Sequence, residues 1–144
     1  MKQKKVYILI GLPGSGKSTW TEEKVKWLEK TEWAICSADT YFIKDGEYQF
    51  DPTKLGTAHR QCFIKFDTHV SVIGTETVIV DNTNIHPEHR QPYIELAEKM
   101  GYIVTLKFFP CSPESAFNRN KHGVPMASIQ RMHNALCDQG YTEE

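Results

Sequence analysis

The stretch that decides the fold is VYILIGLPGSGKS, residues 6–18, near the start of the chain. Its first five residues form an uninterrupted apolar run, which is typical of a strand buried on both faces of a parallel sheet. Residues 11–18 fit the pattern G-x-x-x-x-G-K-[S/T]. The glycines of this pattern let successive backbone N–H groups point into one concavity that holds phosphate groups. The sequence therefore predicts a strand, a phosphate-binding loop and a helix in direct succession.

Each part of this loop has an expected role in binding a nucleoside triphosphate. The Lys17 ammonium should reach the β- and γ-phosphates, and the Ser18 hydroxyl should ligate Mg²⁺. The helix that begins near Lys17 should add the positive end of its dipole. We therefore expect ATP and Mg²⁺ as cofactors. The residues expected to contact the nucleotide are Gly11, Pro13, Gly14, Ser15, Gly16, Lys17, Ser18 and Thr19.

Composition and charge indicate one ordinary domain over residues 1–144. Apolar residues make up 40% and charged residues 24% of the chain, which is usual for a soluble globular domain. The formal net charge is −1, whereas proteins that coat long nucleic acids carry a clear basic excess. No apolar run approaches the roughly 18–20 residues needed to cross a bilayer, and the apolar run before Gly11 is too short for a signal peptide. We expect a cytoplasmic chain with no membrane contact and no obligate protein partner.

Strand-like and helix-like stretches alternate along the chain, which predicts an α/β fold with a single doubly wound parallel sheet of about four strands. The expected strands cover residues 6–10, 33–36, 77–80 and 102–109, and the expected long helices cover residues 17–30, 55–73 and 87–100. The first of these helices should carry Trp20 and Trp27 on one side. Between Tyr41 and Phe50, the dipeptide Asp45-Gly46 favours a type I′ turn and predicts a small hairpin.

Polar side chains follow the second and third expected strands, at the edge where ligands of open α/β sheets collect. Asp39 follows the second strand and could accept the proton of an attacking hydroxyl, although capping of a turn is an alternative. Asp81 ends the third strand in the Walker B manner and could hold Mg²⁺ directly or through water. Asn82 and Asn84 could orient a substrate or fix the helix that follows.

A basic segment follows the fourth strand. Residues 107–131 contain four lysines or arginines and one acidic residue, within a chain of net charge −1. Two short helices are expected here, one opening at Ser112-Pro113 and one at Val124-Pro125, with Gly123 between them. Such a helical segment could close over a nucleotide as a lid, and Arg119 could then stabilise charge on the transferring phosphoryl group. A solvated basic face is the alternative.

Further motifs recur in a recognisable order. They are the phosphate loop with Thr19-Trp20, Ser37-x-Asp39-x-Tyr41-Phe42, Gly46-x-Tyr48-x-Phe50-Asp51, Leu55-Gly56-x-Ala58-His59, Asp81-Asn82-Thr83-Asn84, Arg90 with Tyr93, and Arg119-Asn120-x-His122-Gly123-Val124. Taken together they resemble the polynucleotide 5′-hydroxyl kinases, which include phage and animal end-repair kinases. The resemblance is closer to the P-loop (AAA-type ATPase) domain of the Nedd-binding-protein-2-like proteins, and it extends over nearly the whole chain.

This resemblance implies a P-loop kinase architecture and transfer of the γ-phosphate of ATP to the 5′-hydroxyl of a DNA or RNA end. It implies that Asp39 is the general base, that Lys17 and Ser18 hold the phosphates and Mg²⁺, and that Arg119 is the lid cation. The residues expected to contact the acceptor are Asp39, Tyr41, Phe42, Asn82, Asn84 and Arg90.

Two positions depart from the pattern of the phage-type kinases. Phe42 stands where those enzymes have an arginine that binds the phosphate on the 3′ side of the accepting nucleoside, and His122 stands where their lids carry a second arginine. Phe42, Tyr41 or Tyr48 could instead stack on a base, or the aromatic residues of the hairpin could pack into a small core.

Two other functions stay open. Phe42 and the near-neutral charge favour a kinase of a small molecule, such as a nucleoside or nucleotide. A nucleotide-binding module that recognises nucleic-acid ends with little transferase activity is the other alternative. The presence of both Asp39 and Arg119 argues against the module, because a binder needs neither a base nor a lid cation.

Overall fold

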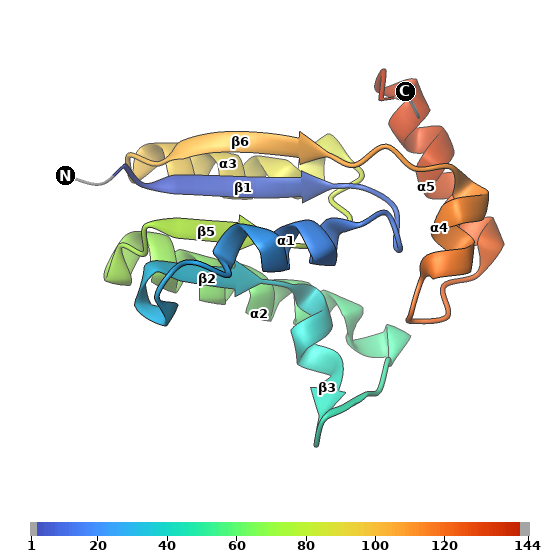
Figure 1. Ribbon diagram of the computed structural model, residues 1–144, viewed down its shortest axis with the longest axis horizontal. Coiled ribbons are helices and arrows are strands. Elements are labelled where there is room, and N and C mark those ends of the chain that lie inside the picture. The colour runs from blue at the N-terminus through green and yellow to red at the C-terminus, as the bar shows by residue number, and fades with distance from the viewer. Residues whose placement is uncertain (1–2, 142–144) are drawn as a thin grey trace.

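A four-stranded parallel sheet forms the centre of the molecule, whose computed structural model describes residues 3–141 (Figure 1). The strands follow the order β2-β5-β1-β6 across the sheet. Their bounds are β1 Lys5–Ile10, β2 Trp33–Cys36, β5 Thr77–Val80 and β6 Ile103–Phe108. All three neighbouring pairs are parallel. The predicted strands and the predicted parallel sheet are confirmed.

The apolar run that opens the chain becomes the central strand. Residue Lys5 of β1 pairs with Thr77 of β5 on one side and with Ile103 of β6 on the other. Four residues of β1 have no exposed surface: Val6, Ile8, Leu9 and Ile10. Both faces of β1 are therefore covered, as the unbroken apolar sequence predicts for a parallel sheet.

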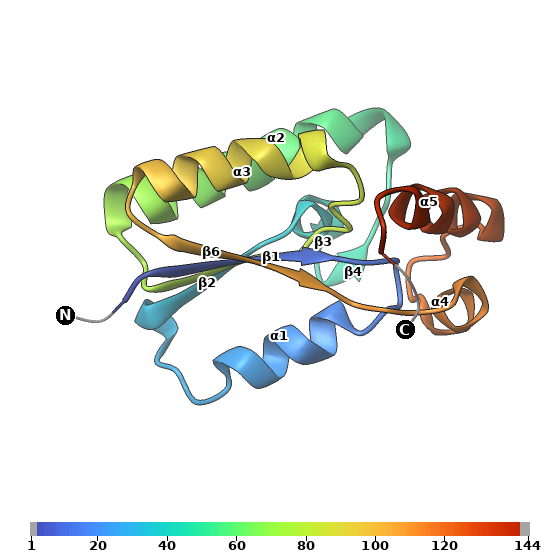
Figure 2. The ribbon, with the colours of Figure 1, turned by 90° about the horizontal axis from the view of Figure 1, so that it is seen from above.

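Helices cover both faces of the sheet, so the fold is doubly wound. Helix α1 (Lys17–Val25) lies on one face, and α2 (Leu55–Asp67) and α3 (Pro87–Lys99) lie on the other (Figure 2). Helices α4 (Pro113–Arg119) and α5 (Met126–Asp138) stand beyond the carboxyl ends of the strands (Figure 1). This pair is the helical segment predicted after the fourth strand. Within residues 3–141, no helix is long and apolar enough to span a membrane.

Aromatic side chains fill the space between the sheet and its helices. On the α1 face, Trp20 packs edge-on against Tyr7 and Phe109. On the opposite face, Phe66 of α2 and Tyr93 of α3 lie with their ring centroids 4.9 Å apart. A separate buried cluster packs α4 and α5, which correspond to the lid segment expected from the sequence, against the ends of the strands. Its members are Ile10, Leu12, Ile85, Ala116, Ile129 and Leu136.

The predicted hairpin is present as strands β3 (Ile43–Lys44) and β4 (Glu47–Tyr48). Its turn residues Asp45 and Gly46 have φ of 52° and 80°, the left-handed values that a type I′ turn requires. A short 3₁₀ helix, Ala38–Phe42, leads into this hairpin, and a second one, Pro52–Lys54, leads out of it into α2. The hairpin therefore projects from the carboxyl edge of the sheet, next to β2 (Figure 1).

One helix ends differently from the prediction, and another has the predicted bounds but changes its helix type. Helix α1 ends at Val25 rather than near Lys30, and Trp27 is 86% exposed instead of packing beside Trp20. The helix ends early because a capping box between Glu29 and Glu32 starts a separate 3₁₀ turn, which leads into β2. The long helix expected over residues 55–73 is α2 followed without a break by a π-helical turn, Thr68–Ile73.

The turn after β5 depends on Asn84. This residue has a φ of 49°, in the left-handed region that asparagine tolerates better than most residues. Its buried side-chain amide donates a 2.7 Å hydrogen bond to the carbonyl of Leu9 in β1. The bond ties the end of β5 to the end of β1, directly before the phosphate-binding loop.

We predict that Asn84→Ala lowers the free energy of unfolding by about 2–3 kcal/mol, because it removes a buried hydrogen bond and leaves a left-handed backbone without its asparagine. Urea denaturation measures the change. Asn134→Ala, which removes an exposed asparagine of α5, is the matched control and should change stability by less than about 0.5 kcal/mol. Equal effects of the two substitutions would contradict the role of Asn84.

Candidate functional site

The phosphate-binding loop joins β1 to α1. The N–H of Gly11 donates to the carbonyl of Thr83, which fixes the start of the loop to the segment after β5. Gly14 and Gly16 have φ of 81° and 102°, so two of the loop glycines occupy conformations that other residues rarely adopt. The buried hydroxyl of Ser15 finds no hydrogen-bond partner among residues 3–141. A buried polar atom left unpaired in this way is suited to an incoming phosphate oxygen.

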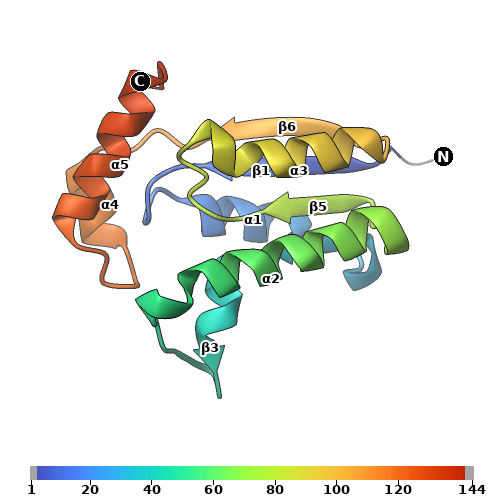
Figure 3. The ribbon, with the colours of Figure 1, turned by 180° about the vertical axis from the view of Figure 1, so that it is seen from behind.

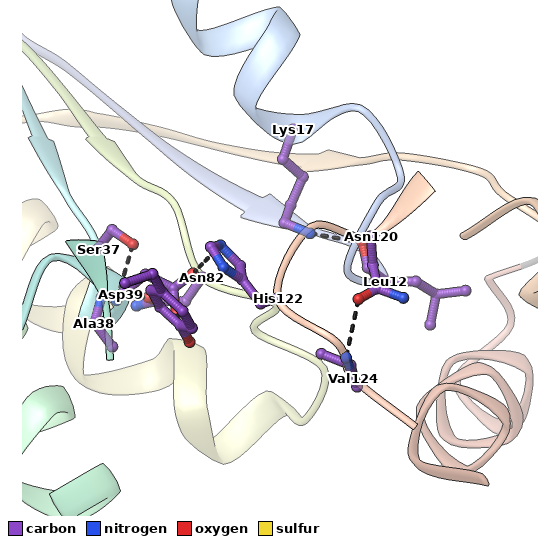
Figure 4. Close-up of polar contacts among 10 residues, drawn as sticks. Leu12, Lys17, Ser37, Ala38, Asp39, Asn82, Asn120, His122 and Val124 are labelled. Carbon is purple, nitrogen blue, oxygen red and sulfur yellow. Dashed lines mark hydrogen bonds and ion pairs between the residues drawn. The ribbon is translucent and has the colours of Figure 1, made fainter. Parts of the chain in front are cut away.

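Lys17 is buried, with 9% of its surface exposed. Its ammonium donates to the carbonyls of Gly11 and Leu12 at 3.0 and 2.7 Å, which Figure 4 shows for Leu12. Burial lowers the pKa of Lys17 from 10.5 to about 8, against the opposing effects of Asp81 and Asp39. The cation is thus held inside the loop, and the two acids are near enough to act on it.

Asp81 lies directly after β5, where its N–H donates to the carbonyl of Cys36 at the end of β2. Burial raises the pKa of Asp81, and the nearby Lys17 ammonium opposes this effect. Ser18 and Thr19 are exposed in the first turn of α1. The carboxylate of Asp81 and the hydroxyl of Ser18 are the hard oxygen ligands that Mg²⁺ prefers, so these residues fit a magnesium ion.

Asp39 lies at the start of the 3₁₀ helix that follows β2. The Ser37 hydroxyl accepts a hydrogen bond from the Asp39 N–H, and the Asn82 side chain accepts one from the Ala38 N–H at 2.8 Å. These two caps hold the backbone, so the Asp39 side chain itself is not used as a cap. Its carboxylate is exposed and accepts a 3.3 Å hydrogen bond from the hydroxyl of Tyr48.

His122 reaches Asp39 from the segment between α4 and α5 (Figure 4). Its Nε2 lies 3.8 Å from Oδ2 of Asp39. The same imidazole lies against the ring of Tyr48, with centroids 3.9 Å apart and planes tilted by 32°. The tip of the lid segment and the hairpin therefore meet over Asp39.

The lid segment is also fixed to the phosphate-binding loop. A Cβ added to Gly14 would lie 2.4 Å from the carbonyl oxygen of Ala116, so the loop and α4 touch through their backbones. The side chain of Asn120 accepts a hydrogen bond from the N–H of Val124 and thereby closes the turn between α4 and α5. Arg119 is exposed at the end of α4, where its guanidinium lies 3.7 Å from the sulfur of Cys111.

Two of the residues expected to contact an acceptor are buried. Phe42 is 2% exposed and packs edge-on against Tyr41, Tyr48 and Phe50. A ring covered to this extent offers no face to a base, so Phe42 belongs to the small aromatic core of the hairpin. Arg90 is 5% exposed, and its Nη2 donates a 2.6 Å hydrogen bond to Gln139 directly after α5. Its Nη1 finds no hydrogen-bond partner among the described residues.

The two asparagines after β5 serve the scaffold. Asn82 bonds to the backbone of Ala38, and Asn84 bonds to that of Leu9. They join the ends of β2 and β1 to the end of β5. This differs from the expected fixing of the helix that follows, because α3 begins after His86 without a side-chain cap. Tyr41 is half-buried beside Phe42.

Two side-chain contacts of Asp39 could not be predicted from the sequence. The sequence indicates Tyr48 only as a stacking surface and His122 only as the replacement of an arginine, yet both side chains approach Asp39. Tyr48 follows Asp39 by nine positions, whereas His122 is distant from both in the chain. The signal that could have suggested these contacts is the presence of all three residues in the motifs quoted above.

Comparisons with known proteins give the family and the fold. Residues 6–133 match the family model described as AAA domain. The chain is 35% identical to NEDD4-binding protein 2 of Homo sapiens in a match that covers 87% of this chain but only 7% of that protein.

Solved structures with a similar fold include the following two. One belongs to the Pnkp1/Rnl/Hen1 RNA repair complex, with a TM-score of 0.73, 18% identity and coverage of 100% of this chain and 48% of that chain. The other is the APS kinase CysC of Mycobacterium tuberculosis in complex with AMPPNP and APS, with a TM-score of 0.57, 18% identity and coverage of 85% and 72%. The fold is therefore that of P-loop kinases.

We predict that Gly14→Ala destabilises the protein by more than about 2 kcal/mol, because the new methyl group would collide with the carbonyl of Ala116 and also strain the backbone. Gly140→Ala is the matched control, since Gly140 has a φ of 93° and open space around it. The control should cost about 1–2 kcal/mol from backbone strain alone. Urea denaturation of both variants measures the difference, and equal losses would mean that the contact between loop and lid is unimportant.

We also predict a pH-dependent effect of Lys17→Met. Because the pKa of Lys17 is about 8 in the folded chain and 10.5 ordinarily, the unfolded chain binds more protons between these values. The stability of the unsubstituted protein should therefore rise across this window, by roughly 2–3 kcal/mol relative to Lys17→Met. Urea denaturation at several pH values measures this difference.

The control for this experiment is Lys26→Met, which removes an exposed lysine just after the same helix. Its stability difference from the unsubstituted protein should show no comparable rise. A constant difference for Lys17→Met between pH 8 and 10.5 would show that the ammonium is not held in a desolvated position.

Proposed function

The chain belongs to the family described as AAA domain, and from this premise we propose that it is an ATP-dependent phosphotransferase that acts on the 5′-hydroxyl of a DNA or RNA end. Its relative NEDD4-binding protein 2 is far longer, so that only 7% of that protein is matched. The proposal therefore concerns the domain formed by this chain. It rests on the residues gathered at the carboxyl edge of the sheet and on the motifs that resemble polynucleotide kinases.

The observation that carries the proposal is the position of Asp39 beside the phosphate-binding loop. Asp39 and Asp81 both lie close enough to Lys17 to raise its pKa against the effect of burial. The Asp39 carboxylate is exposed, and its closest polar partners are the Tyr48 hydroxyl and the His122 imidazole. A carboxylate that is open to solvent and next to a triphosphate site is suited to accept a proton from an attacking hydroxyl.

On the donor side, the loop supplies groups for the phosphates of ATP. The unpaired Ser15 hydroxyl and the positive end of the α1 dipole favour anion binding. Lys17 now bonds to Gly11 and Leu12, and it would exchange these carbonyls for the β- and γ-phosphates. Ser18 and Asp81 would hold Mg²⁺, which neutralises charge on the phosphates when bound.

The transfer itself follows from this arrangement. The acceptor hydroxyl oxygen forms a bond to the γ-phosphorus while the bond from that phosphorus to the β–γ bridging oxygen breaks, and ADP leaves. The hydroxyl proton passes to the Asp39 carboxylate. Arg119, one residue before the turn of the lid, would stabilise the charge on the moving phosphoryl group.

A second candidate is the phosphorylation of a small molecule. The observation that favours it is the burial of Phe42 at the position where phage-type kinases bind a nucleic-acid phosphate with arginine. The order of motifs along nearly the whole chain favours the polynucleotide end. The net charge of −1 is compatible with both kinds of acceptor, because an enzyme that binds only the end of a nucleic acid contacts few of its phosphates.

We predict that the protein transfers label from γ-labelled ATP, with Mg²⁺, to 5′-hydroxyl oligonucleotides. Asp39→Asn should lower kcat by about 10²–10⁴-fold, the usual contribution of a general base. Its affinity for ATP should stay within a few-fold, since the loop is untouched. Transfer is measured by gel separation of the labelled oligonucleotide, with DNA and RNA acceptors in parallel.

The control variant is Asp138→Asn, which neutralises an exposed aspartate at the end of α5. It should retain full activity. Label on nucleosides but not on oligonucleotides would replace the polynucleotide proposal with the small-molecule kinase. Near-normal turnover of Asp39→Asn would show that Asp39 is not the base.

A further inference from the structure

A cavity of about 660 Å³ lies behind the segment after β5, and the site described above does not use it. It lies between α2, the segment after β5, α3 and α5. Figure 3 shows α2 and α3 running side by side on this face, with α5 standing near their ends. Cavities of this size are typical of sites for small organic groups.

The walls of the cavity are formed by flat rings. Helix α2 contributes His59 and Phe63, and the beginning of α3 with the residue before it contributes His86 and His89. The rings of His86 and His89 lie perpendicular to one another, with centroids 5.2 Å apart. The floor includes the buried ring of Tyr93. The cavity therefore offers several aromatic surfaces around one space.

No lysine or arginine is among the described residues that line this cavity. Partial burial lowers the pKa of His59, the neighbouring His89 lowers it further, and Asp39 opposes them. Burial therefore favours the uncharged form of this ring. Glu88 supplies a negative charge among the lining residues. These walls suit an uncharged planar ring.

Two residues connect the cavity to the proposed acceptor side of the site. Asn82 lines it, and the side chain of Asn82 holds the N–H of Ala38, the residue before Asp39. His59 lies within electrostatic reach of the Asp39 carboxylate. A nucleoside whose base entered the cavity would thus have its sugar near the proposed general base.

We propose that this cavity binds the terminal nucleobase of the acceptor, stacked between the rings of α2 and the histidines around the start of α3. The proposal rests on the proposed function, since it assigns the acceptor of that same site. It also accounts for the buried Phe42, because an acceptor held by its base needs no arginine for its 3′ phosphate. The predicted substrate class is a nucleoside end whose recognition depends on the ring.

The test follows the NMR signals of the imidazole rings in the whole chain, which has six histidines. Adenosine at millimolar concentration is added to the protein saturated with AMPPNP and Mg²⁺, and the ¹H–¹³C correlations of the imidazole rings are recorded. The signals of His59, His86 and His89 should shift, because a stacked purine changes the shielding of adjacent rings. His69 and His133 lie outside the cavity and should keep their positions.

Several results would overturn the proposal. One is the absence of any adenosine-dependent shift of the three cavity histidines. A second is a shift caused by inorganic phosphate but not by adenosine, which would make the site an anion site. A third is a full shift on addition of AMPPNP alone with none added by adenosine, which would assign the cavity to the base of the donor.

A variant pair tests the stacking itself. Phe63→Leu keeps an apolar side chain but removes a flat ring, and it should raise the dissociation constant of adenosine about tenfold, since base stacking on an aromatic ring has this order of magnitude. Phe117→Leu alters an exposed ring of α4 outside the cavity and should leave the constant unchanged. Unaltered adenosine affinity in Phe63→Leu would contradict the stacking.

The two proposals can fail separately. If no acceptor is labelled by ATP but adenosine still shifts the three cavity histidines, the kinase proposal is wrong and the base site stands. If oligonucleotides are labelled but neither adenosine nor a 5′-hydroxyl oligonucleotide moves these signals, the kinase stands and the base site is wrong.

Discussion

The parallel pairing of β1 with both of its neighbours is the constraint on which the rest of the structure depends. Because β1, β5, β2 and β6 all run in one direction, their carboxyl ends meet at a single edge. The phosphate-binding loop, Asp39 and Asp81 each follow one of these strands. The parallel pairing therefore brings together residues that are up to about 70 positions apart in sequence, without any further structural element.

Placing Lys17 at this edge has an electrostatic cost, which neighbouring groups of the site partly compensate. Lys17 is an ammonium taken largely out of water, which is unfavourable unless the charge is compensated. The carbonyls of Gly11 and Leu12 provide hydrogen bonds, and the carboxylates of Asp81 and Asp39 provide opposite charge. The lowered pKa of the lysine shows that burial outweighs this compensation. A triphosphate would add the missing negative charge, so the loop is arranged for an anion before one arrives.

Much of the fold could be predicted because its signals are local. The apolar runs gave the strands, the glycine-rich pattern gave the loop, and Asp45-Gly46 gave the hairpin turn. The end of α1 was misplaced, since Trp27 has no tertiary surface to cover it and the Glu29–Glu32 capping box competes with the helix. Periodicity does not include either effect.

The candidate site could be predicted only in its outline. Residues that follow strands were identified, but the partners of Asp39 come from the hairpin and the lid, which sequence spacing does not relate. Phe42 and Arg90 show the same limit from the other side. The resemblance implied that both residues contact a substrate, with packing into a small core as the alternative for Phe42, and only the three-dimensional packing reveals that both are buried. The cavity is likewise formed by helices whose relative placement no motif encodes.

The close approach of Gly14 to the Ala116 carbonyl joins the phosphate-binding loop and α4 into one packing unit, so α4 cannot move away without breaking that contact. Helix α5 is tied to the sheet as well, because Ile129 and Leu136 are buried with Ile10 and Leu12 of the first strand and loop. The turn that carries His122 is therefore held at both of its ends. The contact between His122 and Asp39 is set by the same packing that shapes the phosphate-binding loop.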